Sequence, residues 1–168
     1  MAIIDELGKF GEERTQAEGG TLSDAGANKP LWECPKCGAK LVSRNMWHAC
    51  GPFTVDAFLE GKGARARELF EGFEELLRKC GRVTAAPAKT RVAFMVRVRF
   101  AGVSSVSDRG MTIAFALRRP LKNPRIFKMV KYNPRWYGHF VRIKSPEELD
   151  GELLGWLRES YEVGEQRS

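Results

Sequence analysis

Long hydrophobic runs are missing from this sequence of 168 residues. Its apolar stretches are short and interrupted by Arg or Lys, whereas a membrane-spanning helix needs about 20 consecutive apolar residues. The start of the chain also lacks the basic and apolar regions that form a secretory signal. We therefore expect a cytoplasmic protein with no membrane partner.

Cysteine and histidine are scarce, with four Cys and two His. Three cysteines and one histidine nevertheless fall into one short pattern, Cys34-x2-Cys37-x10-His48-x-Cys50. A Cys-x-x-Cys pair brings two thiolates to one metal ion from a tight turn, and Gly38 supplies the backbone freedom for that turn. Thiolate and imidazole are ligands that zinc prefers.

We interpret Cys34, Cys37, His48 and Cys50 as the ligands of a structural Zn²⁺ ion. Four protein ligands leave no coordination position for a substrate, which argues against a catalytic metal. The alternative is a disulfide between two of the cysteines, but so few cysteines favour a reduced protein. The fourth cysteine, Cys80, is expected to be an inert residue at a helix end.

Acidic residues are almost absent from one third of the chain. Residues 87–144 contain 14 Lys and Arg and a single acid, Asp108, so this segment carries a net charge of +13 and the rest of the chain −6. A charge split of this size indicates an anionic partner, which is nucleic acid, a phosphate-bearing ligand or an acidic protein face.

The usual sequence signatures of enzymes are missing as well. There is no P-loop and no Gly-x-Gly-x-x-Gly after a strand, and no serine nucleophile motif. One acid in the basic segment cannot supply the clustered carboxylates of a metal-dependent nuclease. A binding protein is therefore favoured over an enzyme, although a site assembled from separated strands would leave no local motif.

The pattern of apolar residues predicts three parts. Residues 1–30 are expected to be a poorly ordered tail, 31–53 a zinc knuckle, and 54–164 one domain. In that domain we predict helices over 64–79 and from Ser145 to about Gly164, and strands over 91–100, 111–117, 125–132 and 138–144. The fold class is α+β, with an antiparallel sheet of about four strands packed by two helices.

Basic and aromatic residues of this sheet are the candidates for binding. Neighbouring antiparallel strands are expected to gather arginines into one patch that contacts phosphates, while aromatic rings stack on bases. The competing interpretation is that the aromatics belong to the core and the arginines keep the sheet soluble. The candidates for nucleic-acid or anion binding are Lys89, Arg91, Arg97, Arg99, Arg118, Arg119, Arg125, Lys128, Trp136, Tyr137 and His139.

Two other functions stay open. Lys89, Arg91 and His139 would line a cleft for a small anionic ligand, or the site of an enzyme acting on one, unless Lys89 is simply solvated and His139 structural. Alternatively, the basic face binds an acidic protein. The sequence does not define an oligomeric state.

Several segments resemble a known bacterial family, called domain of unknown function 5655. They are KTRVAF at 89–94, RVRFAG at 97–102, HF at 139–140 and LDGEL at 149–153, together with the Trp-x-Cys-Pro-x-Cys-Gly stretch at 32–38. The resemblance covers about residues 31–164. It implies an α+β domain in a bacterial cytoplasmic protein and no particular activity.

Overall fold

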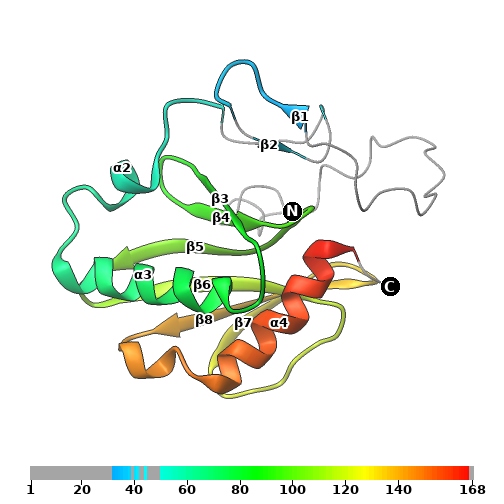
Figure 1. Ribbon diagram of the computed structural model, residues 1–168. Coiled ribbons are helices and arrows are strands. Elements are labelled where there is room, and N and C mark those ends of the chain that lie inside the picture. The colour runs from blue at the N-terminus through cyan, green and yellow to red at the C-terminus, as the bar shows by residue number, and fades with distance from the viewer. Residues whose placement is uncertain (1–31, 39, 42–43, 45–49, 167–168) are drawn as a thin grey trace.

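The computed structural model describes residues 32–38, 40–41, 44 and 50–166. The expected tail at 1–30 and the expected zinc ligand His48 lie outside these residues. Two short strands, β1 (Trp32–Glu33) and β2 (Lys40–Leu41), pair antiparallel near the start of the described chain. All other elements belong to one α+β body (Figure 1).

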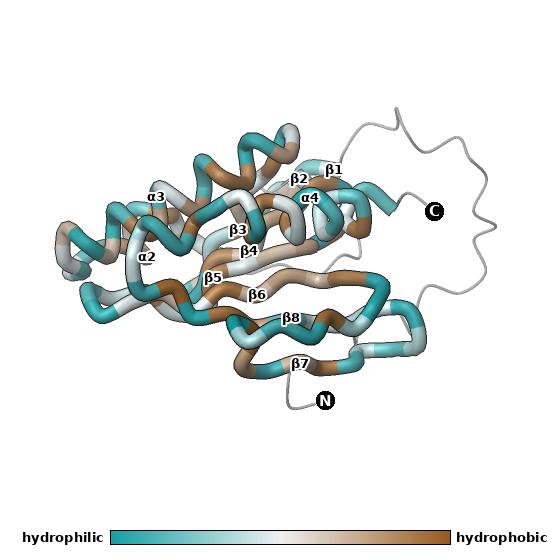
Figure 2. The backbone as a smooth tube through the Cα atoms, turned by 90° about the horizontal axis from the view of Figure 1, so that it is seen from below, coloured by the Kyte–Doolittle hydropathy of each residue, from teal (hydrophilic) through white to brown (hydrophobic). Residues whose placement is uncertain are grey.

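A six-stranded antiparallel sheet forms the centre of the body, in the order β3-β4-β5-β6-β8-β7. Figure 2 shows this order from β3 to β7, with β7 at the edge farthest from α3. The predicted antiparallel α+β fold is therefore confirmed, but the prediction of about four strands is wrong. The strands are β3 (Thr84–Pro87), β4 (Val92–Met95), β5 (Arg99–Ser107), β6 (Gly110–Leu117), β7 (Ile126–Asn133) and β8 (Trp136–Ile143).

The strand predicted over 91–100 is in fact two strands, β4 and β5, joined by a turn. The backbone amides of Arg97 and Val98 both donate to the carbonyl of Gly164 in the last helix, at 3.2 and 3.0 Å. These bonds hold the chain in a turn where its alternating sequence predicts continued extension. β5 then runs on through residues 101–107, where a loop was expected. β3 was not predicted at all.

Three α-helices and one 3-10 helix complete the described fold. They are α2 (Val55–Leu59), α3 (Ala64–Arg78), η2 (Pro146–Glu148) and α4 (Gly151–Glu165). α3 and α4 confirm the two predicted helices. The capping box of Ser145 and Glu148 is present but begins η2, and α4 starts separately where Asp150 accepts a bond from the Leu153 amide. None of the described helices is long and apolar enough to cross a bilayer.

The main core lies between the sheet and the two long helices, which pack on the same face (Figures 1 and 2). Leu69, Phe70 and Phe73 of α3 are fully buried there, as are Ile113 and Val141 of the sheet. Burying each such side chain contributes about 1.5–3 kcal/mol. This apolar packing, with the antiparallel ladder, fixes the positions of the remaining side chains.

The other face of the sheet, here called the outer face, is built from the alternate residues. The residues at its centre are apolar and mostly small: Ala114 of β6 lies opposite Phe140 of β8, and Ala116 lies opposite Gly138. The ring of Tyr132 lies against Gly138, where an added Cβ would overlap it. Toward one end of these strands Thr112 lies opposite Arg142.

Candidate metal centre and basic sheet edge

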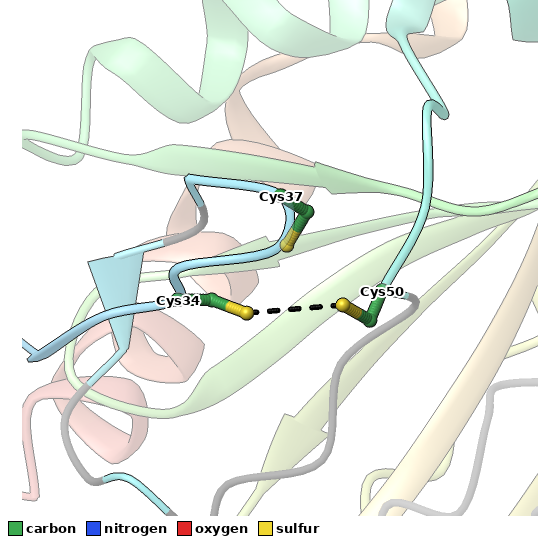
Figure 3. Close-up of side chains that lie close together, drawn as sticks. All are labelled: Cys34, Cys37 and Cys50. Carbon is green, nitrogen blue, oxygen red and sulfur yellow. Dashed lines mark hydrogen bonds between the residues drawn. The ribbon is translucent and has the colours of Figure 1, made fainter.

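A tight turn after β1 positions two of the predicted zinc ligands. The Gly38 amide donates to the Cys34 carbonyl at 2.8 Å, and Gly38 has a φ of 72°, a left-handed conformation that glycine adopts without cost. The turn therefore points Cys34 and Cys37 to the same side. Cys50 reaches them from the segment that leads into α2 (Figure 3).

The three sulfur atoms point toward one another (Figure 3) and lie within 4.8 Å of each other. The Cys34 and Cys50 sulfurs are 3.7 Å apart. Two thiolates on a tetrahedral zinc ion, each at about 2.3 Å, would be separated by about 3.8 Å, whereas a disulfide needs about 2.05 Å. The geometry therefore fits three sulfur ligands of one metal ion and not a disulfide.

The electrostatics of the cluster lead to the same interpretation. Desolvation, followed by the hydrogen bonds and charges of the neighbouring Cys34 and Cys37, raises the pKa of Cys50 to about 11. The Cys50 thiol therefore resists ionisation unless a cation balances its charge. A bound metal ion supplies that balance, because metal binding displaces the thiol protons.

The predicted binding residues are spread over the sheet and its loops. Lys89 lies in the β3–β4 turn, Arg97 in the β4–β5 turn, and Arg118 and Arg119 follow β6. Arg99 begins β5 and is only 6% exposed, so it is not available to a partner on the surface. Arg91 precedes β4, Arg125 precedes β7, Lys128 lies on β7, and Trp136, Tyr137 and His139 lie on β8.

Two of the predicted phosphate ligands are already bound to acids of the C-terminal part. Arg119 donates from Nε and Nη2 to the two carboxylate oxygens of Glu159, both at 2.9 Å. Arg125 donates to Asp150 and Glu152 at 3.0 Å each, and its guanidinium lies 5.6 Å from the Trp156 ring. Both arginines thus fasten α4 and its N-terminus to the sheet.

His139 does not form a site with Lys89. This corrects the prediction that Lys89, Arg91 and His139 line a cleft for a small anionic ligand. The His139 side chain is fully buried and stacks on Phe115, with ring centroids 5.5 Å apart. Its Nε2 accepts a hydrogen bond from the Leu121 amide at 3.0 Å. Burial lowers the pKa of His139. Two strands, β5 and β6, separate β8 from β4, while Lys89 is exposed beyond the start of β4.

Some of the remaining cations lie beside aromatic rings on β7 and β8. The Arg142 guanidinium lies 4.2 Å from the Phe127 ring, and Lys128 Nζ lies 5.1 Å from the Phe140 ring. On β7 and its neighbour, Lys131 Nζ lies 5.7 Å from the Tyr137 ring. Lys131 and Tyr137 lie on the helix side of the sheet, whereas the other four residues lie on its outer face, and we call these four the β7–β8 surface: Phe127, Lys128, Phe140 and Arg142. Residues 109–146 contain no acid.

Sequence reasoning did not include Arg142, Phe127 and Lys131 among the binding residues. The sequence did indicate that Arg142 points away from the core, because it alternates with the buried Val141 and Ile143 on β8. Phe127 gave no such signal, since a register shift between Ile126 and Lys128 decides which way it points.

The single acid of the basic segment has a structural role. Asp108, in the β5–β6 turn, accepts a hydrogen bond from the Ala66 amide at 3.1 Å in the first turn of α3. The N-cap residue of α3 is Gly63, which has no side chain to cap the helix. Asp108 therefore caps α3 from a distant part of the chain and does not form a metal site with other acids.

The described structure is thus an α+β domain preceded by a cluster of cysteines able to hold a metal ion. The chain belongs to the family described as Domain of unknown function (DUF5655), whose model matches residues 55–164. This confirms the resemblance for the body, whereas the cysteine cluster lies outside the matched region. No curated protein and no solved structure matches the chain.

Proposed function

We propose that this protein is a zinc-stabilised binding module that holds single-stranded nucleic acid on its β7–β8 surface. The observation that carries the proposal is the exposed Arg142 beside the exposed ring of Phe127, with the half-buried Lys128 next to them over the buried ring of Phe140. Cations neutralise phosphates, and aromatic rings stack on bases whatever their sequence.

The surroundings of the β7–β8 surface support the proposal. Phe127 is 44% exposed, so part of its ring is accessible to a base. Trp136 and Tyr137, at the start of β8, are half-buried, and Tyr137 lies on the helix side with Lys131. Arg118 is exposed and follows Leu117, the partner of Tyr137, so it extends the cationic surface along the end of the sheet.

Fluorescence anisotropy with labelled single-stranded and duplex oligonucleotides tests this function. We expect binding to the single strand that weakens steeply with salt, because phosphate contacts release counterions. Arg142→Glu should reduce the affinity, whereas Arg109→Glu, an exposed charge in the β5–β6 turn, should have a smaller effect. Binding that is insensitive to salt, or no binding at low salt, would contradict the proposal.

For the metal we propose Zn²⁺ held by Cys34, Cys37 and Cys50, with His48 as the fourth ligand. The sulfur spacing supports zinc, and four protein ligands give the ion a structural role. Metal analysis of protein purified without added zinc should find one zinc per chain. Cys34→Ser should lose it, while Cys80→Ser, a matched change outside the cluster, should retain it. Well-folded wild-type protein without zinc would overturn the assignment.

A further inference from the structure

The two edges of the sheet differ in what they offer to another strand. β3, at one edge, has four residues and ends with Pro87, and a short edge strand containing proline discourages further pairing. β7, at the other edge, has eight residues and no proline. Among the described residues, only β8 pairs with β7. The outer backbone groups of β7 therefore offer a template for a further strand.

The side chains of β7 are also unusual for an edge strand. Phe127 and Met129 are 44% and 43% exposed, and with Phe53 they are the large hydrophobic residues most exposed in the described chain. Phe127 contacts Phe140 on the outer face, whereas Met129 pairs with His139 on the helix side. Each face of the strand thus presents one apolar side chain at the sheet edge.

Each face also presents one lysine beside that apolar residue. Lys128 lies over Phe140 on the outer face, and Lys131 lies over Tyr137 on the helix side. Arg135, in the turn between β7 and β8, is exposed and adds positive charge, and residues 126–135 contain no acid. An incoming strand would therefore meet apolar and cationic groups on both of its faces.

We propose that β7 binds an extended acidic peptide segment of another protein, which adds a seventh strand to the sheet. Main-chain hydrogen bonds to the edge would give affinity, and the side chains of β7 would select apolar and acidic residues. This inference does not rest on nucleic-acid binding, but the peptide would contact Phe127 and Lys128 of the β7–β8 surface, so the two ligands would compete.

A second copy of this chain fits the edge less well. Antiparallel pairing of two β7 strands about their centre would put Lys128 of one copy opposite Lys131 of the other. Like charges directly opposite each other destabilise a strand pair. An acidic strand turns the same positions into favourable pairs, so charge complementarity favours a different partner.

A synthetic peptide tests the proposal with the full-length protein. The probe is a fluorescein-labelled TVEEIVEE peptide, which places acidic and apolar residues on both faces of an extended strand, and binding is measured by anisotropy. We expect saturable binding that drops about tenfold or more in Lys128→Glu/Lys131→Glu, because both lysines then repel the acids. The matched double variant Lys89→Glu/Arg109→Glu carries the same charge change outside β7 and should bind almost as the wild type.

Backbone methylation separates strand pairing from simple charge attraction. The same peptide with an N-methyl group on every amide keeps its side-chain charges but has no N–H left to donate from either edge, so it cannot pair as a strand and should not bind. The proposal would be overturned if the methylated peptide bound as tightly as the unmodified one, or if the unmodified peptide did not bind. It would also be overturned if both double variants lost the same amount of affinity. Sedimentation of the protein alone as a dimer, disrupted by Lys128→Glu, would show a second copy at the edge and overturn it as well.

Discussion

Ser160 joins helix α4 to two strands at once. Its buried hydroxyl donates to the Phe100 carbonyl at 2.8 Å and accepts from the Ala116 amide at 3.1 Å. Ser160→Ala would leave both backbone groups buried without this partner, and each such group costs about 1–3 kcal/mol. Urea unfolding should therefore show a clear loss of stability.

Ser105→Ala is the matched control for this substitution, because Ser105 is exposed on β5. Its effect on the free energy of unfolding should stay within about 0.5 kcal/mol. If the two variants were equally stable, the hydroxyl of Ser160 would not be holding α4 on the sheet.

His139 predicts a specific dependence of stability on pH. Burial lowers its pKa in the folded protein, so the unfolded chain takes up the proton first, near the usual pKa of about 6.5. The unfolded state then binds more protons, and the free energy of unfolding falls as the pH drops below that value. The contribution of His139 is fully present above this pH.

NMR observation of the His139 ring gives the direct test. Its signal should titrate below the ordinary range of histidine, and unfolding at pH 5 should need less urea than at pH 7. The variant His139→Gln should show a weaker pH dependence. A His139 ring that titrates at or above about 6.5 would contradict the role assigned to burial.

At the same scale, Arg119 and Arg125 show why the binding residues were only partly predictable. Both belong to a segment whose sequence contains almost no acid, which favours an anionic partner. Their partners Glu159, Asp150 and Glu152 come from a helix 25–40 residues further along. Tertiary packing therefore neutralises charges that appear unopposed in the sequence.

Among the elements, α3 has a start that depends on a distant turn. The Cβ of Gly63→Ala would overlap the carboxylate of Asp108, which caps the helix. Asp108→Ala should cost about 1 kcal/mol as a lost cap, and Gly63→Ala should also destabilise, because it displaces that cap. The backbone itself at Gly63, with φ −70°, accommodates alanine.

A double-mutant cycle measures this coupling by chemical denaturation. Gly63→Ala/Asp108→Ala should be no less stable than Asp108→Ala alone, because the obstruction and the cap are removed together. Asp108→Asn, which keeps an oxygen acceptor, should lose less than Asp108→Ala. Strictly additive losses in the double variant would mean that Gly63 and Asp108 do not interact.

The elements also show what a local pattern can and cannot predict. Helix α3 and strand β6 carry clear periodicities and were predicted close to their observed bounds, whereas the helix predicted from Ser145 starts as η2 and α4 begins only at Gly151. The turn at 96–98 has no glycine or proline and depends on the Gly164 carbonyl, which the local sequence does not reveal. β3 has only the sequence TAAP, which does not alternate.

On the scale of the molecule, the charges are distributed between the two layers of the fold. The chain from β6 to β8 contains cations and no acid, whereas α3 and α4 contain four glutamates each. Pairs such as Arg119–Glu159 join the layers. The edge strand β7, which contains two lysines and no acid, lies farthest from α3 (Figure 2).

The body should fold without the cysteine cluster. Its main core begins at Phe58 and uses no described residue before Val55, and the family match also begins at residue 55. A chain of residues 55–168 should therefore unfold cooperatively, with a thermal midpoint that a chelator does not change. In the full chain, removing the metal with a chelator should disorder the segment around Cys34, Cys37 and Cys50, because metal binding there is coupled to folding.

Hydrogen exchange on the full chain, with and without chelator, distinguishes the two parts. Faster exchange should be confined to residues 32–50, while the amides of β6 and α3 keep their protection. If chelation instead exposed the amides of the sheet, the metal centre would be holding the body together, and the truncated chain should then fail to fold. The cysteine cluster would in that case be part of the domain itself, even though the family match excludes it.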